Sequence, residues 1–481
     1  MNRLFLICTL ALTGTVSIWA QTERPMNVFT NKGLFYQLPL DTVSTADERL
    51  IFRDGDRRFD HAATAVDSIT FGTVDFRNAV LYITTEDGQA ITSKEVWKDA
   101  HFRMDGGTLF PGFETDGRIR GRGNSTWNWY AYGGDPLVYG RRPYKIKFDE
   151  KQRVLQMNSD RTWVLLANWR DGSFMMNAFA NEVGRYLGFA FTPHNRFCEV
   201  YINGNYEGLY QICEQIERGG HRVDIEEDDI LICLDADDGP NLSPNATNNF
   251  WSMTYNLPVA VKYPKDEALT EAVKKDIRNE LGYLEYRISS HDLKGVRQQL
   301  DVESLIDFLI VQELTCNVEL DAPRSMYMYR TADRIWHFGP LWDFDAGFDF
   351  DWSNMYSGHS YYGSQKLLYG TNPLKPNYKS GTKFFLAMFA SKDFTRAYKE
   401  RWAAVKDALV DTVFTRLDNY RAQLREAIRR NDDRWPIYKD GGNWWWSTPE
   451  RIDPDEEYRR LRQWVQQRIP IMDNAITKYP E

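Results

Sequence analysis

The sequence predicts an α+β fold in which a β-rich first half is followed by a helical second half. Alternation of apolar and polar residues with period two recurs between residues 79 and 213, which is typical of strands. An Asn203-Gly204 pair separates two of these runs, and such a pair is a strong β-hairpin signal. From residue 266 onward helical periodicity dominates. The 481 residues, 42% hydrophobic and 26% charged, fit one large globular domain with extensions, or two domains.

The first 20 residues have the pattern of a secretory signal peptide. Arg3 supplies the positive charge, residues 4–12 are apolar, and Ala20 offers a cleavage point. The apolar run is short for a membrane span, and no later segment carries about 18 apolar residues. Cys8 lacks the preceding small residue that a lipoprotein anchor would need. We therefore expect an exported protein without a membrane span: periplasmic, on the cell surface or secreted.

The net charge limits the kinds of ligand that the protein can bind, and the cysteines limit its possible metal sites and disulfides. The net charge of −9 argues against nucleic acid, whose affinity comes from neutralised phosphates, although local basic clusters could hold a small phosphate ligand. Past the predicted signal, four cysteines lack C-x-x-C spacing, which disfavours zinc. Export would allow disulfides, including a Cys198–Cys213 bridge across the hairpin, and buried thiols are the alternative. The two remaining cysteines are Cys233 and Cys316.

In the first half, polar residues 21–75 predict an N-terminal extension, and the pattern then changes to strands. Strands are predicted at 80–85, 118–127, 144–148 and 163–168, the second running into a glycine-rich turn. A helix capped by Asp171 or Ser173 follows and closes at Gly188, and the hairpin comes next.

In the second half, helices are predicted at 266–293, 302–314, 382–430 and 454–478. A strand pair at 325–329 and 335–338 precedes an acidic motif at 340–347, and 352–380 has a loop composition. Within the motif, Asp343 and Asp345 would share one face of an extended segment. Two neighbouring carboxylates repel each other, so they need a cation, a basic partner or a shared proton.

Residues 119–127, IRGRGNSTW, resemble the I-[KR]-G-R-G-N-S-T-W signature of the CotH family, the spore-coat protein H-like atypical kinases. Segments 142–148, 163–168, 171–188, 200–210 and 340–345 fit the same family in the same order. The resemblance implies an atypical protein-kinase-like fold with a β-rich N-lobe and a helical C-lobe. It also implies phosphorylation of a protein with ATP and Mg²⁺ or Mn²⁺.

With that resemblance, four parts of the chain are expected. They are a signal peptide at 1–20, an N-terminal extension at 21–78, a CotH-like kinase domain at 79–405 and a C-terminal helical segment at 406–481 that packs on the C-lobe.

Phosphoryl transfer needs cations on the nucleotide phosphates, and the β-rich half offers several. Glycines let the 120–126 turn approach phosphates and arginines add bidentate donors, which makes Arg120, Arg122 and Asn124 candidates for the nucleotide. Lys145 and Lys147 share a strand face, and Glu182 on the first helix is the expected partner of the phosphate-binding lysine. The alternative for the 120–126 turn is a tight turn whose arginines pair with acids. The alternative for Lys145 and Lys147 is that both are solvated on an exposed strand face.

The helical half offers the acids. Asp321 is the candidate catalytic acid that orients the acceptor hydroxyl, and an Asp-Ala-Pro turn former is its alternative. Asp343 and Asp345 are the candidate metal ligands. Ser325 stands where the family's pattern has Asn or Ser, and its hydroxyl is a weaker magnesium ligand than an amide carbonyl. Two further acids, Asp349 and Asp351, are interpreted as solvated or loop-ordering.

The sequence therefore predicts an exported kinase acting on Ser or Thr of a surface or secreted protein. The alternative is a catalytically quiet surface module that binds glycan or protein through exposed aromatics, for which core packing is the competing interpretation: Trp127, Trp129, Tyr130, Tyr132 and Trp444 to Trp446. A metal-dependent hydrolase would need a nearby base or a second metal, and the sequence supplies neither clearly.

Overall fold

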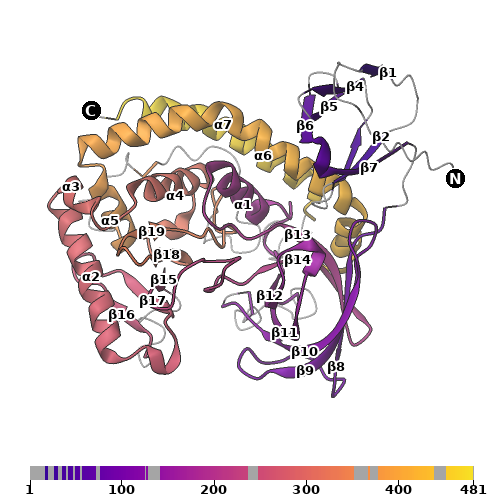
Figure 1. The fold of residues 1–481 in the computed structure, drawn as a ribbon, viewed down its shortest axis with the longest axis horizontal. Helices are drawn as coiled ribbons and strands as arrows, with labels where there is room; N and C mark the ends of the chain where they lie inside the picture. The colour runs from indigo at the N-terminus through magenta and orange to yellow at the C-terminus, as the bar shows by residue number, and fades with distance from the viewer. Residues whose placement is uncertain are drawn as a thin grey trace, which may run out of the picture.

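The structure is a computed structural model that describes most of the chain. The described residues are 17–19, 26–30, 35–38, 42–46, 49–54, 57–71, 76–124, 126–127, 141–236, 247–350, 367–368, 378–437 and 451–479. They form two small N-terminal sheets, a β-barrel, a second large sheet and a set of helices (Figure 1). The predicted α+β class is confirmed.

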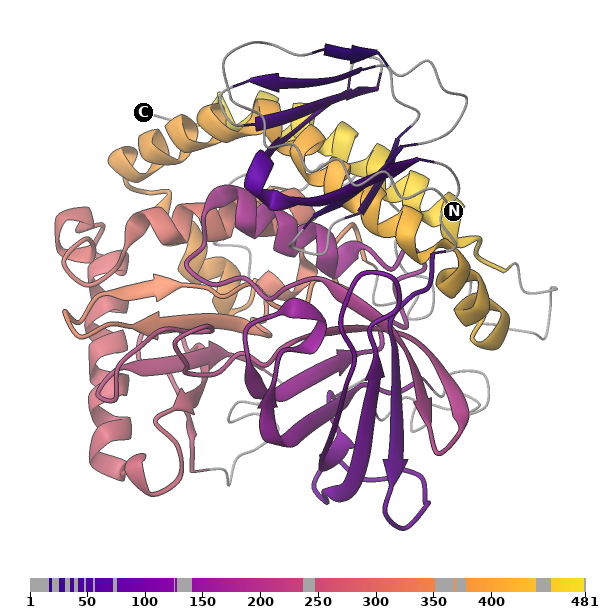
Figure 2. The same cartoon turned by 45° about the vertical axis from the view of Figure 1, so that its right-hand side comes forward.

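The N-terminal extension folds as two small antiparallel sheets beside the long C-terminal helices (Figure 2). One has the order β1 (Ser17–Trp19), β4 (Thr42–Ala46), β5 (Arg49–Asp54) and β6 (Arg57–Ala62). The other has the order β3 (Phe35–Leu38), β2 (Met26–Thr30) and β7 (Val66–Phe71). Met26, Val28 and Phe52 form their small core. Strand β1 falls inside the predicted signal peptide.

The predicted strands of the first half close into a seven-stranded barrel. Its order is β10 (Phe113–Gly121), β11 (Tyr144–Gln152), β12 (Asp160–Leu166), β14 (Asn205–Glu214), β13 (Arg196–Ile202), β8 (Val80–Thr85) and β9 (Lys98–Asp105). Alternate residues such as Ile119, Ile146 and Trp163 fill the interior, so the intervening residues face outward. The hairpin forms as predicted: Asn203 and Gly204 have φ of 50° and 81°, as a type I′ turn requires.

Helix α1 (Met176–Leu187) follows the barrel strand β12 and begins later than the predicted caps Asp171 and Ser173 imply, because its N-cap residue is Met175. The Asp171 carboxylate accepts a hydrogen bond from the Met176 amide at 2.8 Å, and Gly188 ends the helix in the left-handed conformation with φ 90°. Most of α1 is buried against the core of the helical half. The helix therefore joins the barrel to the rest of the molecule.

The second half contains a five-stranded antiparallel sheet surrounded by helices (Figure 1). The strand order is β16 (Asn249–Trp251), β17 (Pro258–Tyr263), β15 (Ile230–Leu234), β18 (Met326–Arg330) and β19 (Trp336–Phe338). The helices are α2 (Glu271–Ser289), α3 (Leu293–Val296), α4 (Val302–Thr315), α5 (Ser380–Met388), α6 (Lys392–Arg434) and α7 (Pro454–Ile476). Short 3₁₀ turns include η5 (Val318–Leu320) after α4.

Several expectations need correction. The helix predicted at 382–430 is two helices, because Ser391 caps a new one, and α6 then runs without a break across residue 405. Cys198 and Cys213 lie opposite Tyr210 and Val164 in the barrel, so the possible bridge between them does not form, and all four cysteines are thiols.

Within the described residues, no helix is long and apolar enough to cross a membrane. The kinase-like division into lobes stays a prediction; the closed barrel was not predicted.

Candidate functional site

The acidic motif is a loop, not the strand that the sequence suggested. Asp343 has a φ of 66°, which breaks any extended run. Two hydrogen bonds fix the loop on both sides. The Phe344 amide donates to Asn177 Oδ1 on α1 at 2.7 Å, and the Val318 amide of η5 donates to the Ala346 carbonyl at 3.2 Å. The loop is therefore held between α1 and the segment that follows α4.

Despite the turn, Asp343 and Asp345 point at each other and share a hydrogen bond between their side chains. Ser325 lies beside them, with its hydroxyl 3.3 Å from Asp343 Oδ2. Burial, and then the charge of Asp345, raises the pKa of Asp343 to about 7, while Arg122 and Arg170 oppose the shift. Asp343 is nevertheless an exposed residue, so solvent reaches its side chain. Burial likewise raises the pKa of Asp345.

A third acid, Glu319, lies next to this pair. Its side chain is buried, with 7% exposure, and its Oε2 has no hydrogen-bond partner among the described residues. Burial raises the pKa of Glu319 well above its usual value, and the charges of Asp343 and Asp345 add to the rise. Glu319 was not among the site residues predicted from the sequence. Its signal was present in the Asn317–Asp321 run, where two acids stand two residues apart.

Asp321, the predicted catalytic acid, holds the beginning of α5. Its Oδ1 accepts hydrogen bonds from the Lys379 amide at 2.9 Å and the Thr382 hydroxyl at 2.8 Å. Its carbonyl accepts a third from the Gly381 amide at 3.0 Å. Asp321 therefore acts as a helix cap in this structure, and the acid whose pKa responds to the charges of Asp343 and Asp345 is Glu319.

The glycine-rich turn reaches the acidic loop through Arg122. The Arg122 guanidinium lies 5.5 Å from the centre of the Trp342 ring. Trp342 is the residue directly before Asp343 in the sequence. Gly121 permits the fold of this turn, because a Cβ there would come within 2.3 Å of the Trp127 ring. Arg120 instead lies over Trp97 at 4.9 Å and donates to the Lys94 carbonyl.

The rest of the turn packs on the barrel. The carbonyl of Asn124, an exposed residue, accepts a hydrogen bond from the Trp127 amide at 3.1 Å. Trp127 itself is only 4% exposed, which agrees with core packing. The other aromatics considered for ligand binding, at 129–132 and 444–446, lie outside the described residues.

Lys145 and Lys147 both face outward from β11, directly opposite Arg120 and Arg118 of β10. Burial lowers the pKa of Lys145 to about 8. Glu217 opposes that shift, and Lys265, Arg120 and Arg122 reinforce it. Lys145 therefore lies in a cluster of positive charge that includes Arg122. Lys147, two residues further along the strand, is half-buried.

Glu182 is not brought to either lysine. It is buried on α1, where its carboxylate accepts hydrogen bonds from Asn195 at 2.8 Å, Tyr420 at 2.9 Å and Arg416 at 3.0 Å. Burial pushes the pKa of Glu182 upward, but Arg185 and Arg416 outweigh that effect and hold the pKa below its usual value. The residue links α1 to α6, and the acid whose charge acts on Lys145 is Glu217.

The arrangement suits a divalent cation bound together with phosphates. In the described part of the chain, no three Asp, Glu, His or Cys side chains converge into a preformed metal cage. Magnesium, however, usually takes one or two carboxylates and completes its shell with phosphate oxygens and water. The Asp343–Asp345 pair, with the partnerless Glu319 oxygen behind it, fits that requirement.

Cations on the barrel thus lie within electrostatic reach of an acid cluster on a neighbouring loop, a combination expected of a phosphate-handling protein. A family model described as CotH kinase protein matches residues 119–472, which is most of the chain. The protein therefore belongs to the CotH kinase family. The match begins within β10, so β8 and β9 complete the barrel from outside it. A search of curated proteins finds no match.

Proposed function

We propose that the protein is a kinase that transfers a phosphoryl group from a magnesium or manganese complex of ATP to Ser or Thr of another protein. One observation carries the proposal. Arg122 acts on both sides of the site, since its charge lowers the pKa of Asp343 and also that of Lys145. Phosphate-binding cations and metal-binding carboxylates therefore stand within electrostatic reach of one another, as phosphoryl transfer requires.

In this proposal the barrel residues bind the nucleotide. Arg122 and Lys145 contact the phosphates, with Arg120, Asn124 and Lys147 around them. Asp343 and Asp345 would hold the metal ion, and Ser325 would support it with its hydroxyl. The ion, when bound, would neutralise charge on the transferred phosphoryl group. Trp342, under Arg122, keeps the guanidinium directed toward the acidic loop.

The acceptor hydroxyl needs an acid to orient it. Asp321 is the candidate from the family pattern, but its carboxylate is occupied at the start of α5. Glu319 is favoured for this role, because it is the acid that lies beside Asp343 and Asp345 and has an oxygen to spare. We also propose that the protein is exported and acts on a surface or secreted protein, which rests on the signal-like residues 1–20.

The direct test is phosphoryl transfer by the purified protein with labelled ATP and Mg²⁺ or Mn²⁺. We expect label in the protein itself or in casein, and none with an Asp343→Ala variant. A variant that labels as well as the parent would contradict the proposal. A thermal shift with nucleotide plus metal gives an independent readout, since a ligand that binds only the folded state raises the unfolding temperature.

A further inference from the structure

The connection between β8 and β9 ends in a short segment, residues 93–97, that lies on the glycine-rich turn. The Gly121 amide donates a hydrogen bond to the Ser93 carbonyl at 2.9 Å. The Lys94 ammonium donates to the Gly123 carbonyl at 3.0 Å. The segment is therefore fixed to the turn at two points, although it lies outside the residues that the CotH kinase model matches.

Lys94 brings a positive charge to the middle of the turn. Gly123, whose carbonyl it contacts, stands between Arg122 and Asn124, two of the residues proposed to bind the nucleotide. An ammonium group carries three N–H donors, and this carbonyl takes one of them. No carboxylate among the described residues pairs with Lys94. Its charge and its other two donors are therefore available to a ligand.

Other cations lie near Lys94. Its carbonyl accepts a hydrogen bond from Arg120, whose guanidinium lies 4.9 Å from the centre of the Trp97 ring. Arg120 in turn lies directly opposite Lys145 in the pairing of β10 with β11. Burial lowers the pKa of Lys145 most, and the charges of Arg120 and Arg122 add to the fall. Positive charges gathered in this way repel one another, so an anion bound between them would be stabilised.

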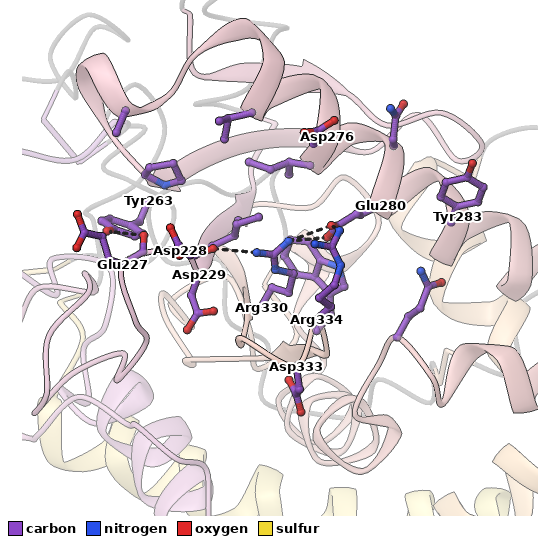
Figure 3. A pocket seen from close by; sticks show the side chains of 18 of the residues that line it. Glu227, Asp228, Asp229, Tyr263, Asp276, Glu280, Tyr283, Arg330, Asp333 and Arg334 are labelled. Carbon is purple, nitrogen blue, oxygen red and sulfur yellow. Dashed lines mark hydrogen bonds and ion pairs between the residues drawn. The ribbon is translucent and has the colours of Figure 1, made fainter.

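Two arginines of the helical half show the opposite arrangement. They line a groove between α2 and the large sheet, together with six carboxylates (Figure 3). Arg330 makes two hydrogen bonds to Glu280, at 3.0 and 2.9 Å, and Arg334 pairs with the same carboxylate (Figure 3). That groove would repel a phosphate. The distribution of charge therefore favours the turn beside Lys94 as the place where a phosphate binds.

We propose that Lys94 is a phosphate-binding residue of the nucleotide site, with its ammonium bridging a nucleotide phosphate and the Gly123 carbonyl. A lysine suits this role because its ammonium acts on phosphate as a point charge with several donors. The proposal rests on the proposed kinase function. It adds to that function a binding residue that the family match does not include.

The test measures binding of inorganic tripolyphosphate by calorimetry, without metal and without nucleotide. Lys94→Met removes the charge and the hydrogen bond to Gly123, whereas Lys94→Arg keeps a charge and several donors. The matched control is Lys98→Met, because Lys98 pairs with Asp87 instead of with the turn. Unfolding temperatures measured without ligand show whether each variant is folded.

We expect Lys98→Met to bind tripolyphosphate like the parent, Lys94→Arg to keep most of the affinity, and Lys94→Met to bind at least about tenfold more weakly. The affinity of Lys94→Met should also depend less on salt, which a disturbed turn alone would not explain. With Mg-ATP, Lys94→Met should raise the KM for ATP more than it lowers kcat.

Equal affinity of Lys94→Met and the parent would overturn the proposal, and so would a loss in Lys94→Arg as large as that in Lys94→Met. If the parent transfers phosphoryl from ATP in that case, the kinase assignment stands without Lys94. Conversely, tripolyphosphate binding that depends on Lys94, in a parent that transfers no phosphoryl group, would contradict the kinase assignment and still support the phosphate site.

Discussion

The amide of Phe344 in the acidic loop donates a hydrogen bond to Oδ1 of Asn177, at 2.7 Å, across the boundary between that loop and α1. Asn177 in turn donates to Asn168 Oδ1 at 3.2 Å, and Asn168 donates to Gln211 Oε1 at 3.0 Å. This series of buried amides runs from the acid pair to strand β14 of the barrel. The position of Asp343 and Asp345 is thus tied to the barrel that carries the cations.

Replacing Asn177 with Ala should loosen the loop and weaken the site. The Phe344 amide would lose its acceptor in a buried place, which costs about 1–3 kcal/mol of stability. We expect a lower midpoint in urea and weaker stabilisation by Mg-ATP in thermal shift assays. Asn474→Ala, at an exposed position on α7, is the control and should change neither. Unchanged stability and Mg-ATP response in Asn177→Ala would show that the hydrogen bond does not hold the loop.

Variants of Glu319 and Asp321 should differ in their effects on stability and on turnover. Asp321→Asn weakens a helix cap, so we expect about 0.5–2 kcal/mol lower stability with turnover kept in the folded fraction. Glu319→Gln removes a buried acid from beside two others, so we expect equal or higher stability and a large loss of kcat. Urea unfolding and single-turnover phosphorylation measure both quantities. The reverse pattern, with turnover lost only in Asp321→Asn, would return the catalytic role to Asp321.

The pH dependence of the metal-free protein should report on Asp343. Its folded-state pKa, raised to about 7, lies above the ordinary value. Protonated Asp343 therefore favours the folded state at low pH, and that contribution is lost as the pH rises from about 4 through 7. In EDTA we expect the unfolding temperature to fall over this window, and Asp343→Asn to flatten the fall. Because protons and metal compete, Mg²⁺ affinity measured by calorimetry should rise between pH 6 and pH 8. A flat affinity would contradict this assignment.

Lys145 and Lys147 provide a matched pair for the nucleotide. Both face outward from β11, but only Lys145 lies opposite Arg120 and within the electrostatic reach of Arg122. We expect Lys145→Met to weaken ATP binding by about tenfold or more, the loss of one charge-assisted phosphate contact. Lys147→Met should have a smaller effect. Titration with a fluorescent ATP analogue compares the two, and equal losses would mean that the phosphates extend along the strand.

Local features of this fold were predictable from sequence, and long-range ones were not. The Asn203-Gly204 hairpin, the Asp171 cap and the Gly188 helix end all depend on neighbouring residues. Closure of the barrel depends on the parallel pairing of β8 with β13, in which Val80 lies opposite Glu199. Nothing near Val80 in the sequence encodes that contact.

The candidate site shows the same difference between local features, which the sequence indicates, and long-range contacts, which it does not. The glycine-rich turn, the lysine strand and the acid pair could be selected as candidates from the sequence, because each is a short run of residues, and their roles stay predictions. Glu182 was assigned to the wrong partner, since the residues that hold it, Arg416 and Tyr420, come from α6 more than 230 residues later. Likewise, Asp321 was predicted as the catalytic acid and Glu319 was given no role, because only the fold shows that the Asp321 carboxylate is bonded to the beginning of α5.

The 43-residue helix α6 has a mechanical consequence. About 65 Å long, it touches the barrel through Arg430, which pairs with Glu199 at 2.6 Å, and through Asn431, which accepts from the Leu209 amide. One continuous helix also packs on α1, α4 and α7. Helix α6 therefore connects the barrel rigidly to the helical half. Hinged opening of the barrel away from the acidic loop would break the Arg430 and Asn431 contacts, so we expect ATP to enter by movement of loops over a rigid frame.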